Sequence, residues 1–241
     1  MQVKIRLDKF LSLAGLGSRR SINSILKSKQ VRVNGVIITS PHYKIDPEKD
    51  YITYKEVSVS YKNFLYYKMY KPVGVITSTK DKDTTVMDIL PKDLLGYKGI
   101  FPAGRLDKDA EGLLILTNDG ELAHRITHPK WKVPKIYEII IDKPLQKEDK
   151  SALEEGVLLK EGKTLPTQIE YLDNTGSNLK ITVYEGRYHL IKRIFKKLGY
   201  RVLKIKRIAI GNVFLEDLKP GEIRLLSPSE IESLKKALRL R

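Results

Sequence analysis

The stretch that organises the chain is GRLDKDAEGLLILTNDG, residues 104–120. It begins with a dense run of charge between two glycines and then turns into four aliphatic residues, 113–116. A short apolar run that ends at an Asn-Asp-Gly turn is typical of a buried strand. The carboxylates of Asp107, Asp109 and Glu111 are therefore expected on a loop that leads directly into the core. This pattern alone fits either a solvated, salt-bridged turn or a catalytic loop.

The overall composition limits the class of protein. A chain of 241 residues can hold one substantial core together with a small module. The formal net charge of +16 favours a polyanionic partner, and nucleic acid fits better than an anionic membrane surface. No apolar run is long enough to span a bilayer, and the N-terminus lacks the apolar segment of a signal peptide. We therefore expect a cytoplasmic protein with no membrane partner.

Metal chemistry finds little support in the residue types present. The chain has no cysteine, which excludes thiolate metal sites and disulfides. Its four histidines form no ligand pattern with carboxylates at usable spacing. We predict that the protein holds no metal.

Residues 1–60 are predicted to form a compact basic module. Apolar residues at helical spacing predict two short helices, the second capped by Ser18. Strands at 31–33 and 36–38 flank Asn34-Gly35, which predicts a hairpin with a type I′ turn. The first 32 residues contain eight basic side chains and one acidic side chain, Asp8. Such a one-signed surface favours phosphate binding, although it also fits a simple solvated face.

The remainder, residues 63–241, alternates between strand and helix patterns. We predict strands at 64–69, 135–141, 167–172, 179–184 and 202–210, and helices at 86–90, 121–127, 147–155 and 191–198. A capping box, Ser227-Pro228-Ser229-Glu230, predicts the start of a final helix. Residues 180–207 carry ten basic side chains against Glu185 alone. That excess fits either an exposed basic helix or a second surface that contacts nucleic acid.

Four motifs resemble those of the RNA pseudouridine synthases. Residues 104–120 are similar to the active-site segment of that family. The others are Lys-Pro-Val-Gly at 71–74, Lys-Ile-Tyr-Glu at 135–138 and EGRYHLIKRIF at 185–195. The likeness is greatest to the ribosomal branch, and the last motif looks most like the small-subunit rRNA enzyme. The resemblance implies an α+β catalytic domain with a mixed, mainly antiparallel sheet flanked by helices.

The resemblance also implies roles for individual residues. Asp107 occupies the position of the catalytic aspartate, whereas Asp109 and Glu111 do not, which argues against a glycosidase carboxylate pair. Tyr137 matches the tyrosine that stacks on the target base, and Ile205 matches the apolar residue that packs beneath it. Lys192 stands where many members place an arginine that pairs with the aspartate.

Two departures from the family pattern bear on this site. Leu190 replaces a common glutamine, and lysine at position 192 keeps the charge but loses the bidentate fork of arginine. We expect three further cations, Arg105, Arg187 and Arg193, to help bind the substrate.

The N-terminal module resembles the small RNA-binding domain shared with ribosomal protein S-four. The likeness rests on residues 5–11, 17–20 and 31–35. It implies that RNA is held by shape and phosphate contacts more than by base reading. The residues expected to bind RNA are Arg6, Lys9, Ser18, Arg19, Arg20, Lys27, Arg32 and Asn34.

These observations predict an enzyme that isomerises a specific uridine of ribosomal RNA to pseudouridine. The reaction needs no cofactor, and one carboxylate suffices as a nucleophile at C1′ or C6 or as a base toward the 2′ proton. The sequence leaves these three roles open. We expect small-subunit rRNA, free or in an assembly intermediate, as the partner of a monomeric enzyme. The alternatives are a large-subunit rRNA synthase and a non-catalytic RNA-binding assembly factor.

Overall fold

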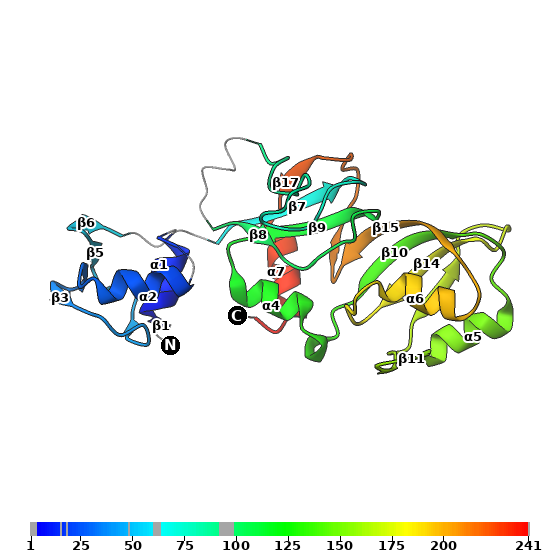
Figure 1. Cartoon of the computed structure of the whole chain (residues 1–241), viewed down its shortest axis with the longest axis horizontal. Helices are drawn as coiled ribbons and strands as arrows, with labels where there is room; N and C mark the ends of the chain where they lie inside the picture. The colour runs from blue at the N-terminus through cyan, green and yellow to red at the C-terminus, as the bar shows by residue number, and fades with distance from the viewer. Residues whose placement is uncertain are drawn as a thin grey trace. The chain divides into compact units, whose positions relative to one another are not determined.

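The computed structural model describes residues 4–14, 16–17, 19–47, 49–59, 64–91 and 99–240, with only the backbone of Arg19 and Arg20. The chain divides into two compact units (Figure 1). One comprises residues 1–65 and 91–100, and the other comprises residues 66–90 and 101–241. This division differs from the predicted one, 1–60 and 63–241, mainly because residues 91–100 group with the N-terminal unit.

The described residues of the N-terminal unit form two short helices and several short strands. They are β1 (Ile5–Arg6), α1 (Leu7–Leu13), α2 (Arg19–Lys27), β2 (Val31–Val33), β3 (Val36–Ile37), β4 (Lys44–Ile45), β5 (Ile52–Tyr54) and β6 (Val57–Ser58). Strands β3, β2, β5 and β6 form one antiparallel sheet, and β1 pairs with β4. Phe10 of α1 and Leu26 of α2 are buried in a shared core. The predicted hairpin is confirmed, since Asn34 and Gly35 have φ angles of 50° and 84°.

The larger unit contains the remaining elements. Its strands are β7 (Tyr66–Lys71), β8 (Phe101–Pro102), β9 (Glu111–Thr117), β10 (Lys135–Ile141), β11 (Leu158–Leu159), β12 (Gly162–Lys163), β13 (Gln168–Tyr171), β14 (Asn178–Val183), β15 (Val202–Ile210), β16 (Val213–Phe214) and β17 (Ile223–Leu225). Its helices are α4 (Gly120–Thr127), the 3₁₀ turn η1 (Pro129–Trp131), α5 (Lys147–Glu155), α6 (Leu190–Lys197) and α7 (Pro228–Ala237).

Nine of these strands form one sheet with the order β13-β14-β10-β15-β9-β7-β17, to which β16 and β8 add at β15 and β9. Every pairing is antiparallel except that between β15 and β9. The predicted α+β class with a mixed, mainly antiparallel sheet is confirmed. In Figure 1, α5 and α6 lie beside the β10–β14 half, whereas α4 and α7 lie beside the β7–β9 half.

Strand β9 lies inside this sheet, between β15 and β7, as its apolar run predicts. Residues 113–116 have no exposed surface, and β7 pairs with the strand along this run. At its start, Gly112 has a φ of 109° and lies opposite Arg207 of β15. A Cβ atom added at Gly112 would lie 2.2 Å from the Arg207 carbonyl oxygen. Only glycine therefore allows the two strands to approach at this point.

Local signals account for the ends of the helices. Asp119 caps α4 by accepting hydrogen bonds from the backbone amides of Glu121 and Leu122. The predicted capping box of Ser227 and Glu230 is present at the start of α7. The predicted helix at 86–90 is wrong, since the segment forms turns. There the amides of Asp88 and Leu90 donate to the carbonyls of Thr85 and Met87, which closes i→i+3 turns, and Pro91 has no amide to continue a helix.

Candidate active site

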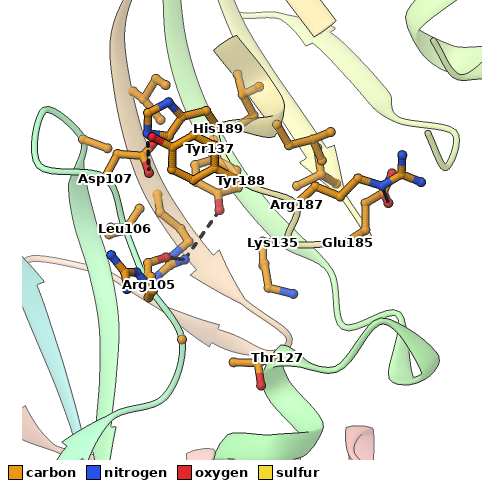
Figure 2. A pocket seen from close by; sticks show the side chains of 18 of the residues that line it. Arg105, Leu106, Asp107, Thr127, Lys135, Tyr137, Glu185, Arg187, Tyr188 and His189 are labelled. Carbon is orange, nitrogen blue, oxygen red and sulfur yellow. Dashed lines mark hydrogen bonds and ion pairs between the residues drawn. The ribbon is translucent and has the colours of Figure 1, made fainter. Parts of the chain in front are cut away.

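A cavity of about 550 Å³ opens in the larger unit beside the loop that precedes β9 (Figure 2). It is lined by that loop, by β10 and β15, and by residues 185–192, which lead into α6. Its volume is in the range of small-ligand sites, about 300–1,000 Å³. The cavity brings together the predicted residues Arg105, Asp107, Tyr137, Arg187, Lys192 and Ile205. Arg193 is absent from this lining.

Asp107 lies on a loop that is fixed at several points. The hydroxyl of Thr77 donates to the carbonyl of Leu106 at 2.9 Å and accepts from its amide at 3.1 Å. The amide of Gly74 donates to the carbonyl of Lys108 at 2.7 Å. The Lys-Pro-Val-Gly segment and Thr77 therefore hold both sides of Asp107, whose side chain is 30% exposed at the cavity.

Two cationic or protonatable side chains of the α6 region face Asp107. His189 Nε2 lies 3.4 Å from Asp107 Oδ1, and Lys192 Nζ lies 4.0 Å from Oδ2. Lys192 makes closer contacts with Asp109, at 2.5 Å to each carboxylate oxygen. This hydrogen bond lowers the pKa of Asp109 below its usual value. Lys192 thus forms only a long ion pair with Asp107 and takes Asp109 as its nearest partner.

Tyr137 and Ile205 line the cavity from neighbouring strands, as the resemblance implies. Tyr137 is 9% exposed and Ile205 is 6% exposed, so both present mainly packed side chains. Tyr137 lies opposite Arg207 in the β10–β15 ladder, and its hydroxyl lies 3.5 Å from Arg207 Nη1. The guanidinium carbon is 5.9 Å from the centre of the tyrosine ring.

Arg207 is a site residue that the sequence reasoning missed. Its side chain is 2% exposed. Nε donates to the carbonyl of Leu113 at 2.7 Å, and Nη1 donates to that of Arg105 at 3.2 Å. One guanidinium therefore ties β15 to β9, to the Asp107 loop and to Tyr137. Arg207 and Ile205 are two residues apart on β15, so the sequence could have indicated that both point to the same face. The hydrogen-bond partners of Arg207, however, depend on the order of the strands in the sheet.

Two buried lysines were also missed. Lys71 has no exposed surface, and its Nζ donates to the carbonyls of Pro72 and Val75 at 2.8 Å each. Burial lowers the pKa of Lys71 to about 8, although Asp107 and Asp109 act in the opposite direction. Lys135 is 8% exposed, and burial together with the charge of Arg207 lowers its pKa to about 8. The site is therefore strongly electropositive around Asp107.

Two of the three arginines predicted to bind substrate already have partners. Arg187 Nε pairs with Glu185 at 2.7 Å, and its Nη atoms donate to the carbonyls of Gly162 and Lys163. Arg193 Nη2 pairs with Glu161 at 2.5 Å. Both arginines join the β11–β12 hairpin to the α6 region. Their role toward the substrate stays a prediction.

Tyr188 stands at the mouth of the cavity and was not predicted. It is 75% exposed, and its ring stacks on His189 with centroids 3.8 Å apart. Both rings lie next to the cavity in Figure 2. His189 has a left-handed φ of 48°, which turns the chain into α6.

The predicted RNA-binding residues of the N-terminal unit differ in their surroundings. Arg6 forms a fork with Asp8, at 3.0 Å from Nε and 2.6 Å from Nη2. Arg32 pairs with Glu56 at 3.2 Å. Asn34 bridges Asp50 and the amide of Tyr51, so its side chain stabilises the fold locally. Lys27 is exposed and Lys9 is half-buried.

The remaining predicted residues cannot be placed in the same way. Ser18 lies outside the described residues, and so do the side chains of Arg19 and Arg20. Within the ranges that the structure describes, no three His, Asp or Glu side chains gather as a metal site. None of the described helices is both long enough and apolar enough to cross a bilayer.

The chain belongs to the RNA pseudouridylate synthase family. The family model with that description matches residues 66–197, and a model for the S4 domain matches residues 5–50. The predicted family, fold class and type of N-terminal domain are therefore confirmed.

Relatives match over nearly the whole chain. An uncharacterized RNA pseudouridine synthase of Bacillus subtilis is 40% identical, across 95% of this chain and 98% of its own length. The ribosomal small subunit pseudouridine synthase A of Haemophilus influenzae is 36% identical across 96% and 100%. The ribosomal large subunit pseudouridine synthase B of Bacillus subtilis is 35% identical across 95% and 95%. A crystal structure of a pseudouridylate synthase superposes with a TM-score of 0.68 and 36% identity, across 95% of this chain and 99% of the other.

Proposed function

We propose that this RNA pseudouridine synthase converts a specific uridine of small-subunit ribosomal RNA to pseudouridine. The main evidence for this proposal is that Asp107, Tyr137 and Ile205 line one cavity. A carboxylate beside an aromatic and an aliphatic surface can hold a base that has left its stack and react with it.

The reaction rearranges bonds within one nucleotide. The N1–C1′ bond breaks, the base turns within the cavity, and a C5–C1′ bond forms. The hydrogen at C5 leaves to solvent, and N1 gains a proton, so no oxidant or other group is required. Asp107 acts as a nucleophile at C1′ or C6, or as a base toward the 2′ proton, and the geometry is compatible with all three roles.

The surrounding side chains are proposed to stabilise and orient these steps. Lys192 and Lys71 offset the negative charge of Asp107. Lys192 forms an ion pair with its carboxylate, and Lys71 interacts with it electrostatically. Stacking of the base on Tyr137 is worth roughly 1–3 kcal/mol. Extrusion of a base from its stack costs a few kcal/mol, so stacking together with packing on Ile205 can offset that cost.

The N-terminal module is proposed to supply affinity and placement. Residues 1–60 contain none of the residues assigned to chemistry, and their basic side chains suit phosphate contacts. We assign RNA contacts to Arg6, Lys9, Ser18, Arg19, Arg20, Lys27, Arg32 and Asn34. Residues 63–241 are proposed to carry catalysis, with Arg105, Arg187 and Arg193 beside the substrate.

The choice of rRNA rests on the relatives and on the last motif. Relatives named for the small and large subunits match at 36% and 35% identity. The motif Glu-Gly-Arg-Tyr-His at 185–189 favours the small subunit. We further propose that one copy of the chain acts in the cytoplasm, on free rRNA or on an assembly intermediate.

Mapping of pseudouridines in rRNA from cells with and without the gene tests this proposal. We expect one or a few small-subunit positions to lose pseudouridine when the gene is absent. Loss from large-subunit rRNA instead would support the alternative substrate. An unchanged map would favour a non-catalytic assembly role.

A further inference from the structure

The part of the cavity away from Asp107 contains a buried cation that has no anionic partner among the described residues. Lys135 lines this part together with Thr127 (Figure 2). The only hydrogen bond described for its ammonium group is to the carbonyl of Val133, at 3.1 Å. The group has three N–H donors, so two remain available to a ligand.

The one cavity carboxylate near this end is already occupied. Glu185 accepts the amide of Leu165 at 2.7 Å with Oε1 and pairs with Arg187 at 2.7 Å with Oε2. Burial and the charge of Arg207 lower the pKa of Lys135, and no ion pair is described for its ammonium group within the described part of the chain. A cation held in this way is costly to the protein unless a ligand completes its environment.

Arg207, which also lines this cavity, carries a second unsatisfied donor. Its Nη2 atom is buried and has no hydrogen-bond partner within the described part of the chain. The other two guanidinium nitrogens are held by backbone carbonyls and by Tyr137. The guanidinium is therefore fixed in place while one nitrogen stays available. A fixed arginine beside a lysine is a suitable pair for the oxygens of a phosphate.

The position of Lys135 indicates which phosphate this is. Lys135 and Tyr137 are two residues apart on β10 and point to the same face, so their Cα atoms lie about 6–7 Å apart along the strand. Tyr137 is assigned to the target base, and this offset is comparable to the step from a nucleoside to its neighbouring phosphate. A neutral uracil carbonyl at Lys135 would leave both cations without a compensating charge.

We propose that Lys135 and Arg207 Nη2 form an anion subsite for the phosphodiester adjacent to the flipped uridine. This inference rests on the proposed function, because the bound anion belongs to the backbone of the same RNA. The subsite fixes the sugar of the target nucleotide relative to Asp107, while Tyr137 fixes its base.

The test uses the full-length protein and an RNA oligonucleotide that spans the uridine converted by the wild-type enzyme. One RNA carries a neutral methylphosphonate on the 5′ side of that uridine, and a second carries it on the 3′ side. The sugar preceding each neutral linkage is 2′-deoxy, because a neighbouring hydroxyl would cleave it. Each reference RNA has the same sugar and an ordinary phosphate. Equilibrium binding is measured for the wild type, Lys135→Met and Lys147→Met, the last being an exposed lysine on α5.

We expect one of the two neutral linkages to weaken binding by the wild type roughly 10- to 100-fold, the effect of one charge-assisted hydrogen bond. Lys135→Met should bind the reference RNA more weakly than the wild type does, and the neutral linkage should weaken its binding clearly less than it weakens binding by the wild type, because only Arg207 remains to contact the phosphate. Lys147→Met should behave as the wild type does.

Three results would overturn the subsite. If neither neutral linkage weakens RNA binding by the wild type, the protein makes no contact with these phosphates. This result uses the wild type alone, so it does not depend on whether a variant folds. A Lys135→Met protein that binds weakly but is as sensitive to the neutral linkage as the wild type indicates that the lysine does not contact this phosphate. If the wild type forms no pseudouridine, the proposed function is wrong, and so is the subsite that rests on it.

Discussion

Replacement of Gly112 by alanine should strongly destabilise the larger unit. The added Cβ would lie 2.2 Å from the carbonyl oxygen of Arg207 and 2.7 Å from its nitrogen. Both clashes are with backbone, so β9 and β15 must separate at their parallel pairing. A φ of 109° adds strain of about 1–3 kcal/mol for a residue with a side chain. Forced repacking adds about 1–3 kcal/mol, which gives roughly 2–6 kcal/mol in total.

Thermal unfolding followed by circular dichroism measures this effect. For a unit of this size, 1 kcal/mol corresponds to roughly 2–4 °C, so Tm should fall by at least about 4 °C. Gly120→Ala, at the first residue of α4, is the matched control, because an added Cβ there meets no atom within 4 Å. An unchanged Tm for Gly112→Ala would refute the close approach of the two strands. Activity below Tm should also fall, since the Asp107 loop begins next to this point.

Three further predictions concern charge. Lys192→Met should lower kcat much more than it weakens RNA binding, and Lys192→Arg should keep a good part of the activity; single-turnover and binding assays separate the two effects. Replacement of Lys9 and Lys27 by glutamine should lower the slope of log affinity against log salt by about 0.7–0.9 for each phosphate that the protein no longer neutralises. An unchanged slope would mean that these lysines of the N-terminal module are only solvated. Because the pKa of Lys135 is lowered to about 8 in the folded state, that state binds fewer protons than the unfolded state above pH 8. The stability of the wild type relative to Lys135→Met should therefore rise from pH 8 to pH 10 in denaturant titrations, and a constant difference would argue against a buried lysine.

The sequence predicted those features that depend on local pattern. The aliphatic run at 113–116 can only be buried, and Asn34-Gly35 supplies the positive φ angles of its turn. The motif positions of Asp107, Tyr137 and Ile205 likewise carried over to one cavity. The helix predicted at 86–90 is wrong because these five residues form i→i+3 turns, and Pro91 has no amide with which to extend them into a helix.

Other features depend on strand order and loop conformation, which local pattern does not contain. Arg207 reaches Leu113, Arg105 and Tyr137 only because β15 lies between β10 and β9. Lys192 was predicted to pair with Asp107, but the turn of the loop brings Asp109 closer to it. Lys71 and Lys135 resemble ordinary strand-end lysines in the sequence, since nothing nearby along the chain indicates their burial.

The central claim is that Asp107 performs the chemistry, and release of tritium from C5 tests it most directly. Ribosomal RNA labelled at C5 of uridine loses tritium to water when the base is rejoined through that carbon. We predict release by the wild type and by Asp109→Asn, and none by Asp107→Asn, although all three fold and bind RNA. Substantial release by Asp107→Asn would contradict the assignment, and free uracil among the wild-type products would indicate a glycosidase.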